Sequence, residues 1–405
     1  MKKLRIFPLI LAVVMTFSLT SCVEAVLYSF DAEDDLSILF TSDDEFYCYG
    51  DRSLFSDTES HTPYKLTNPK LALDVSMTDT TAVFLTSDGL MATGIPADLP
   101  FGDVSTVAIT EPVRFVYDET TAKLDPTARY VSADLSDAKQ VVSGADFTLV
   151  LKQDGTIYGW GSNKEGQLLA DEEITHINTP VRVGSLEGIS QIACSYGKLC
   201  AAIDMDGHVW VWGANCHGLG ALPLRMPDLE QAVQVVCTGG VGAVFEIDGQ
   251  GIGEWGCVYA LDANAKVWYM DFSSSGVPYF SGEVKGLPEV YSLVAGYDFC
   301  AAKDGDGNVW TWGGYNRWGQ LGREVNDDWR AGHEQGGQLP AKVEGLTGVI
   351  SLAAGRNHVL AMTQNMTVYG WGDNSHGQLG VDPATTPYSA TPIQAPKINM
   401  NVSRA

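Results

Sequence analysis

The sequence is poor in basic residues, with 25 lysines and arginines against 50 aspartates and glutamates in 405 residues. The formal net charge at pH 7 is therefore −25. Proteins that bind nucleic acid neutralise phosphates with clustered lysine and arginine, so this excess of acids disfavours such a partner. We expect no nucleic-acid partner, whereas a basic protein or a neutral glycan suits the charge.

Motifs of common catalytic and metal centres are also missing. The seven histidines are scattered, and no His-Glu-x-x-His pair is present to hold zinc. The eight cysteines contain no Cys-x-x-Cys pair, so buried thiols are the simplest interpretation of them. A disulfide between Cys194 and Cys237 is the alternative. We predict no catalytic residue, no metal and no cofactor.

Long hydrophobic runs are absent after the first 20 residues. Three basic residues precede an apolar stretch over residues 6–17, which is too short for a comfortable membrane span. The following Leu-Thr-Ser-Cys at 19–22 looks like a bacterial lipobox, which predicts a lipoprotein signal peptide over residues 1–21. Cys22 would then be diacylated and would anchor the protein to the extracytoplasmic face of the cell membrane. Ordinary cleavage nearby, with Cys22 unmodified, is the alternative.

What the sequence does contain is a phrase that recurs, first seen as Tyr-Gly-Trp-Gly-Ser-Asn-Lys-Glu-Gly-Gln-Leu at 158–168. Four clear copies are headed by Trp160, Trp212, Trp312 and Trp371. The spacings are 52, 100 and 59 residues (212 − 160, 312 − 212 and 371 − 312), and the long gap contains a worn copy with Met270 in the tryptophan position. Two more worn copies end at Gly50 and Gly94. A unit copied seven times indicates a repeat architecture.

Each unit predicts four strands. An apolar lead-in runs to an Asp-Gly turn such as Asp154-Gly155, which we expect to be a type I′ hairpin. The tryptophan phrase forms a third strand, and a proline-marked segment such as 179–183 suits an outer edge strand. Seven such units without intervening helices predict an all-β fold, a seven-bladed β-propeller of four-stranded blades over residues 22–405.

The repeat resembles that of the regulator of chromosome condensation family. Units of that family carry an alanine-glycine lead-in, an Asp-Gly hairpin, a Trp-Gly-x-Asn phrase and a Gly-Gln-Leu-Gly close, and this chain keeps them best in its third, fourth, sixth and seventh copies. The resemblance implies the propeller fold. It does not carry over nucleotide exchange or chromatin docking, because no motif residue of this chain can be matched to those roles.

The repeated residues are predicted to be framework, and binding residues are expected where the copies disagree. The framework set is Trp160, Trp212, Trp312, Trp371, Asn163, Asn215, Asn316 and Asn374. The candidate partner-binding set consists of loop aromatics and one arginine, residue types that dominate interface hot spots: Trp318, Trp329, Arg330, Phe272 and Tyr279.

These observations favour a non-catalytic, monomeric cell-surface lipoprotein that binds a protein through one face of the propeller. One alternative is a module for glycan or cell wall, with exposed tryptophans as stacking platforms. Another is a propeller enzyme, a lyase or glycosidase that uses carboxylates such as Asp327 and Asp328.

Overall fold

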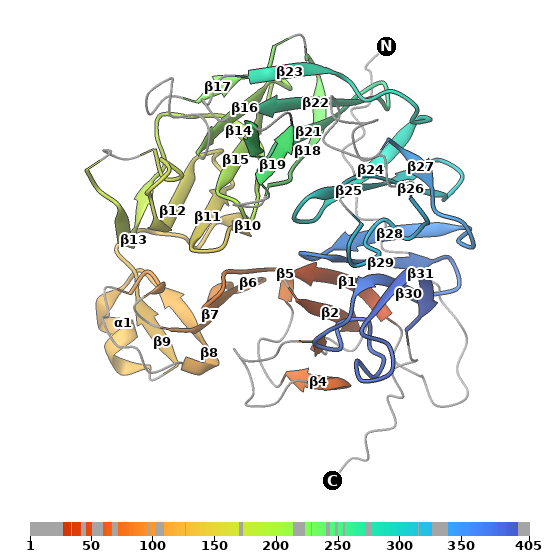
Figure 1. Ribbon diagram of the computed structural model, residues 1–405. Coiled ribbons are helices and arrows are strands. Elements are labelled where there is room, and N and C mark those ends of the chain that lie inside the picture. Colours follow the sequence, from red (N-terminus) through yellow and green to blue (C-terminus); the bar gives the residue numbers. More distant parts are fainter. Residues whose placement is uncertain are drawn as a thin grey trace, which may run out of the picture.

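The protein is described by a computed structural model that is almost entirely β (Figure 1). The residues that the structure describes are 27–33, 35–41, 46–50, 60–66, 72–95, 98–101, 109–125, 127–169, 173–213, 223–227, 229–239, 244–247, 250–253, 256–272, 278–314, 316–325 and 339–395.

Seven of the sheets follow one another along the chain and are the blades of a propeller. Blades 1 to 3 contain β1 (Leu27–Glu33), β2 (Leu36–Thr41), β3 (Phe46–Gly50), β4 (Ser60–Leu66); β5 (Ala72–Met77), β6 (Thr81–Thr86), β7 (Gly89–Gly94), β8 (Ile109–Val116), β9 (Ala128–Tyr130); and β10 (Ala138–Ser143), β11 (Phe147–Lys152), β12 (Ile157–Ser162), β13 (His176–Arg182). Blades 4 and 5 contain β14 (Ile189–Cys194), β15 (Leu199–Asp204), β16 (Val209–Gly213), β17 (Leu224–Arg225); and β18 (Ala232–Cys237), β21 (Cys257–Asp262), β22 (Val267–Phe272), β23 (Pro278–Glu283). Blades 6 and 7 contain β24 (Val290–Ala295), β25 (Phe299–Asp304), β26 (Val309–Gly313), β27 (Ala341–Lys342); and β28 (Val349–Ala354), β29 (His358–Thr363), β30 (Val368–Asp373), β31 (Tyr388–Gln394). The predicted seven-bladed propeller is confirmed.

Two blades carry additions to this plan. Blade 2 has a fifth strand, because β9 pairs in parallel with β8 after a short helix, α1 (Glu119–Leu124). Asp118 caps that helix by accepting a hydrogen bond from Thr120 N. In blade 5 the hairpin of β19 (Val244–Ile247) and β20 (Gln250–Gly253) is inserted between β18 and β21.

The first strand of every blade lies innermost. These first strands contact one another in ring order, β1, β5, β10, β14, β18, β24 and β28, and β28 returns to β1. Because strands within a blade alternate in direction, the loops after each first and third strand lie on one face of the ring. The turns after each second strand lie on the opposite face. We call the first the cluster face and the second the hairpin face.

Among the described strands, blades 7 and 1 share none, a point that the sequence left open. The last strand, β31, pairs with β30 of its own blade, and β1 pairs with β2. Blades 7 and 1 are joined by side chains instead: His358 Nε2 lies 2.9 Å from Ser37 Oγ, which donates to Gln378 O at 2.6 Å. Tyr47 and Leu360 belong to the apolar cluster between the same two blades.

The repeat tryptophans are wedges between neighbouring blades. Trp160, Trp212, Trp312 and Trp371 are fully buried. Each packs against the blade before its own; Trp312, for example, meets the ring of Tyr259 edge-on at 5.6 Å. Met270 occupies the corresponding place between blades 4 and 5. Burial of such large apolar side chains between rigid sheets is a main source of the ring's stability.

The predicted type I′ geometry of the Asp-Gly hairpins is wrong. That turn needs positive φ at two central residues, but Gly155 has a φ of +80° and the preceding Asp154 is absent from the positive-φ residues. Gly155 N donates to Lys152 O, so the glycine follows a tight turn as a bulge. Asp154 instead accepts a hydrogen bond from Thr156 N. The aspartate side chain fixes the turn, and only the glycine needs the left-handed region.

Candidate functional site

Three side chains from blades 4, 6 and 7 meet at the centre of the cluster face. Tyr196, Tyr297 and Arg356 stand in equivalent loops, between the first and second strands of blades 4, 6 and 7. The guanidinium carbon of Arg356 lies 4.4 Å from the ring centre of Tyr196 and 5.1 Å from that of Tyr297. The two rings are 5.8 Å apart and edge to face. We call these residues the central cluster.

Hydrogen bonds tie the central cluster to the surrounding loops. Tyr196 Oη donates to Asp79 Oδ1 at 2.6 Å, and this hydrogen bond links blade 4 to blade 2. Tyr297 N donates to Arg356 O at 2.8 Å, and Gly239 N donates to Tyr297 O at 2.7 Å. Loops of five blades, 2, 4, 5, 6 and 7, are therefore connected, and the cluster is held in a fixed arrangement.

The central cluster is half-buried and carries both charge and aromatic surface. Burial raises the pKa of Tyr297 above its usual range, against the opposing effect of the nearby Arg356 charge. Tyr297 is accordingly neutral at physiological pH, and the arginine is the charged member. Tyrosine and arginine are enriched in the centres of protein interfaces. The attraction between the Arg356 cation and the two aromatic rings helps to hold the three side chains together.

Sequence reasoning missed the central cluster. Its members follow three of the apolar lead-ins, and the sequence pattern of these lead-ins predicts strands but no binding residues. Nothing in the sequence brings positions 196, 297 and 356 together, because their meeting depends on closure of the ring.

The asparagines of the repeat hold the outer loops of the same face. Asn163 Oδ1 accepts a hydrogen bond from Leu168 N at 3.0 Å, and its Nδ2 donates to Ile174 O at 2.8 Å. Asn316 and Asn374 accept the same bond from Leu321 N and Leu379 N. Their amides are thus engaged in framework contacts. The fourth predicted asparagine, Asn215, lies outside the described residues.

The Gly-Gln-Leu part of the close of one blade receives the tryptophan of the next. Trp212 Nε1 donates to Gln167 O at 2.8 Å, and Trp371 Nε1 donates to Gln320 O at 3.0 Å. Trp160 and Trp312 follow blades 2 and 5, which lack this close, and their buried Nε1 atoms have no hydrogen-bond acceptor among the described residues. Loss of the close in one blade thus coincides with loss of the indole hydrogen bond of the next blade.

Of the five predicted binding residues, the structure describes the side chain of Trp318. Trp318 is 38% exposed on the loop after β26, on the cluster face, and its backbone N donates to Gln320 Oε1. Phe272 lies in β22, the third strand of blade 5, and Tyr279 lies in β23, its outermost strand. The side chains of both lie outside the described part. Trp329 and Arg330 lie outside the described residues, as does Cys22, the predicted lipidation site.

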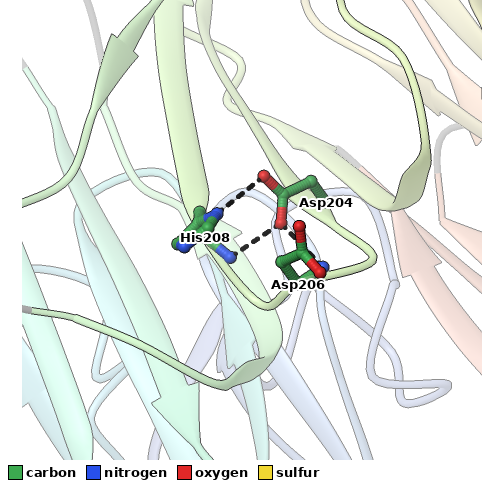
Figure 2. A group of neighbouring side chains, drawn as sticks. All are labelled: Asp204, Asp206 and His208. Atoms are coloured by element: carbon green, nitrogen blue, oxygen red, sulfur yellow. Dashed lines mark hydrogen bonds and ion pairs between the residues drawn. The ribbon is translucent and has the colours of Figure 1, made fainter.

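On the hairpin face, Asp204, Asp206 and His208 stand together in the turn between β15 and β16 (Figure 2). This is the one group of acidic, histidine or cysteine residues within the described ranges that is tight enough to be considered for a metal ion. His208 Nδ1 lies 3.0 Å from Asp204 Oδ2, and His208 N donates to Asp204 Oδ1 at 2.9 Å.

The carboxylate of Asp204 is already occupied as the centre of the turn. Trp210 Nε1 donates to it at 2.9 Å, in addition to the bonds from His208. Burial acts to raise the pKa of Asp204, but these hydrogen bonds outweigh it and hold the pKa below its usual range. Asp304 in blade 6 has the same pattern, with Asn308 in place of the histidine and Trp310 as the indole donor. The same turn thus forms in blade 6 with an asparagine, a poor metal ligand, in place of the histidine. We therefore interpret the arrangement as a structural turn.

A serine and a lysine at acyl-transfer spacing were also overlooked in the sequence. Ser195 and Lys198 stand as Ser-x-x-Lys, the spacing of some β-lactam-binding enzymes. In the structure Ser195 Oγ accepts a hydrogen bond from Leu199 N, while Lys198 Nζ lies 3.1 Å from Asp146 Oδ2. The buried serine caps a turn and the lysine forms an ion pair, so both residues stabilise the loop.

No helix within the described ranges combines the length and the apolar character that crossing a membrane requires.

Comparison with known proteins identifies the repeats. A family model described as the regulator of chromosome condensation (RCC1) repeat matches residues 138–167 and 349–378, and a second of the same description matches 154–202 and 306–362. The Arabidopsis thaliana ultraviolet-B receptor UVR8 is 30% identical over 268 residues, which cover 60% of this chain and 56% of the receptor. The human E3 ubiquitin-protein ligase HERC2 is 28% identical over 341 residues, 78% of this chain but 6% of the ligase. The chain thus spans about half of the first relative and a small part of the second.

Solved structures agree on the architecture. Prp20p from Saccharomyces cerevisiae superposes with a TM-score of 0.64 over 92% of this chain and 88% of its own, at 16% identity. Human WBSCR16 gives a TM-score of 0.58 at 18% identity over 83% of this chain and 84% of its own. These likenesses concern the fold. With the matched repeats and the seven blades, they show that the chain is a β-propeller of the regulator of chromosome condensation (RCC1) type.

Proposed function

We propose that this chain is a non-catalytic, surface-tethered module that binds a protein partner through its cluster face. The observation that carries the proposal is the central cluster, a rigid group of two tyrosines and an arginine at the centre of one face. Trp318 lies on the same face and adds an exposed aromatic side chain. A half-exposed arginine and aromatics on a rigid support are what a protein-binding hot spot requires.

Structural relatives support a protein partner in general terms. Prp20p has been studied for its binding to Gsp1p and histones, and it has been crystallised with Kap60. Those partners are known for that protein, and their shared feature is that each is a protein. For this chain the strong negative charge favours a partner with a basic surface, because opposite charges raise the rate of encounter.

The tether is the lipid on Cys22. The lipobox sequence at 19–22 supports it, and two acyl chains give stable anchoring. Metabolic labelling with a fatty acid tests this part of the proposal. Label should enter the full chain and should be lost in Cys22→Ala, whereas an unlabelled wild-type chain would refute the anchor.

Binding is tested by capture from the envelope and culture fluid of the producing cell, followed by identification of the captured protein. The full chain is compared with Trp318→Ala and Arg356→Ala on the cluster face. Met205→Ala is the matched control, because Met205 is 73% exposed on the turn between β15 and β16, on the hairpin face.

We expect one stoichiometric protein to be captured by wild type and by Met205→Ala, and to be weakened at least about tenfold by Arg356→Ala, the loss of a strong hot spot. A melting curve of each variant separates lost binding from lost folding. Capture that survives both cluster-face substitutions would refute the assignment of the face. Capture of wall polysaccharide alone would favour the glycan alternative.

A further inference from the structure

Two cysteines face each other across the first two strands of blade 4. Cys194, the last residue of β14, is the register partner of Cys200 in β15. Both pack in the apolar cluster between blades 3 and 4. Cys200 is buried and Cys194 is half-buried. In the structure no disulfide joins any of the six described cysteines, and the alternative pairing of Cys194 with Cys237 is not formed.

The ladder places this pair where side chains come closest. Ser195 N donates to Leu199 O at 2.8 Å, so residues 195 and 199 are a hydrogen-bonded pair. Hydrogen-bonded and non-hydrogen-bonded pairs alternate along an antiparallel ladder, so Cys194 and Cys200, one step further, are a non-hydrogen-bonded pair. The Cα atoms of such pairs are about 4.5 Å apart. Disulfides span Cα separations of about 4.4–6.8 Å.

Blade 3 shows that side chains at these two positions do meet. Its equivalent residues are Ser143 and Thr148, which are register partners in β10 and β11. The neighbouring bond is also the same, since Gly144 N donates to Phe147 O. Ser143 Oγ and Thr148 Oγ1 lie 3.0 Å apart. Sulfur atoms on the same two positions need to approach by only about 1 Å more to reach the S–S bond length of about 2.05 Å.

We propose that Cys194 and Cys200 are a modification site, where a cross-strand disulfide forms by exchange with an external disulfide. The thiolate of the more accessible Cys194 attacks the oxidant and releases one thiol. Cys200 Sγ then displaces the second thiol from the mixed disulfide. The two S–H groups lose their protons, the protein gives up two electrons, and the external disulfide is reduced to two thiols. The proposal depends on the proposed location only for the supply of that oxidant.

The bond would secure the loop that carries Tyr196. It would close a ring over residues 194–200, which holds the central cluster's first tyrosine and the strained Lys198 at a φ of +74°. Tyr196 would be held toward Asp79 and Arg356 by a covalent link as well as by its own contacts. The oxidation state of blade 4 is thereby coupled to the order of the cluster face.

Peptide mapping tests the disulfide. The full chain is incubated with oxidised glutathione, alkylated under denaturing conditions and digested with trypsin, which places Cys194 and Cys200 on the separate peptides 183–198 and 199–225. All samples carry Cys216→Ser, because Cys216 lies on the second peptide. We expect the two peptides to be recovered as one linked species, lighter by two hydrogens than their sum and split by reductant.

Blade 6 supplies an internal control. Cys300 occupies the position equivalent to Cys200, but its register partner is Ala295. No cross-strand link should therefore form at Cys300 within blade 6. Cys194→Ser should abolish the linked species while the circular dichroism spectrum stays unchanged. Separate, fully alkylated 183–198 and 199–225 peptides from the folded Cys216→Ser chain would overturn the proposal. A link from Cys194 to Cys237 would overturn it as well.

Discussion

At the scale of single residues, the four repeat tryptophans share their burial but differ in the indole hydrogen bond. Trp212 donates to Gln167 O, while the Trp312 indole N–H is buried with no acceptor among the described residues. A buried donor that lacks a partner forfeits its solvation, whereas a satisfied one contributes to stability. The same residue type therefore has two energetic roles within one ring.

This difference predicts an asymmetry between two equal substitutions. Trp212→Phe should lower the free energy of unfolding by about 1–3 kcal/mol more than Trp312→Phe, because only the former leaves a buried carbonyl without its donor. Urea unfolding followed by circular dichroism measures both. Equal losses would show that the indole hydrogen bond contributes nothing.

The turn glycines make a second residue-scale prediction. Ala265 in blade 5 has a φ of +63° at the position where blades 3, 4 and 6 have glycine. The left-handed region costs a residue with a Cβ about 1–2 kcal/mol, partly offset by the larger unfolded-state entropy of glycine. Ala265→Gly should therefore stabilise the protein by about 0.5–1 kcal/mol, seen as a higher melting temperature.

The converse substitution is the control for that experiment. A Cβ at Gly155 would lie 2.9 Å from Ile189 N, and its φ is +80°. Gly155→Ala should lower the melting temperature. If Ala265→Gly lowers it too, the turn geometry does not govern stability at blade 5.

At the scale of elements, the joint between β2 and β29 depends on the protonation of one histidine. Ser37 Oγ gives its proton to Gln378 O, so His358 must donate from Nε2 and keep Nδ1 without a proton. Nδ1 is buried with no hydrogen-bond partner in the described part of the chain, so a proton added there would find no acceptor. Burial lowers the pKa of His358 to about 3, against 6.5 for an unperturbed histidine.

This arrangement predicts a pH dependence of stability. Between pH 6.5 and about 3 the unfolded chain binds a proton on this histidine that the folded chain does not. The stabilising contribution is therefore complete above pH 6.5 and falls by about 1.4 kcal/mol per pH unit as the pH drops toward 3. Urea midpoints at pH 7.5, 6 and 5 measure it.

His358→Phe provides the matched variant, because Phe147 and Phe299 fill the equivalent positions in blades 3 and 6. The variant should lose this part of the pH dependence, whatever its stability at pH 7.5. An unchanged slope would assign the effect to other groups.

At the scale of the whole molecule, each blade is built from strands that follow one another along the chain, apart from the β19–β20 insertion in blade 5. Among the described strands, none is exchanged across the closure between blades 7 and 1. Propellers whose first and last strands share a blade gain a hydrogen-bonded ladder there, whereas the described residues of blades 7 and 1 meet through contacts of side chains. The outer strand β31 still completes blade 7 by pairing with β30.

Removal of β31 should accordingly destabilise the ring. Deletion of residues 388–405 exposes the edge of β30 and should lower the melting temperature by several degrees or cause aggregation through the open edge. Deletion of residues 396–405, which begins after β31, is the control and should have a much smaller effect. Equal behaviour of the two truncations would mean that β31 contributes little to stability.

The sequence by itself determined the repeat count, the blades and the positions of the wedge tryptophans. This information is local, because each unit carries its own apolar alternation, turn residues and Trp-Gly phrase within about 50 residues. The turn type was mispredicted since the Asp-Gly pair alone does not reveal that the aspartate side chain, through Thr156 N, holds its own backbone out of the left-handed region.

Only the tertiary structure decided which residues meet. Tyr196, Tyr297 and Arg356 lie in three separate units, and their contact exists because closure of the ring turns equivalent loops toward one axis. The pairing of Cys194 with Cys200 likewise follows from strand register. Contacts across the ring depend on how many blades close and where the first strand meets the last, which no single repeat encodes.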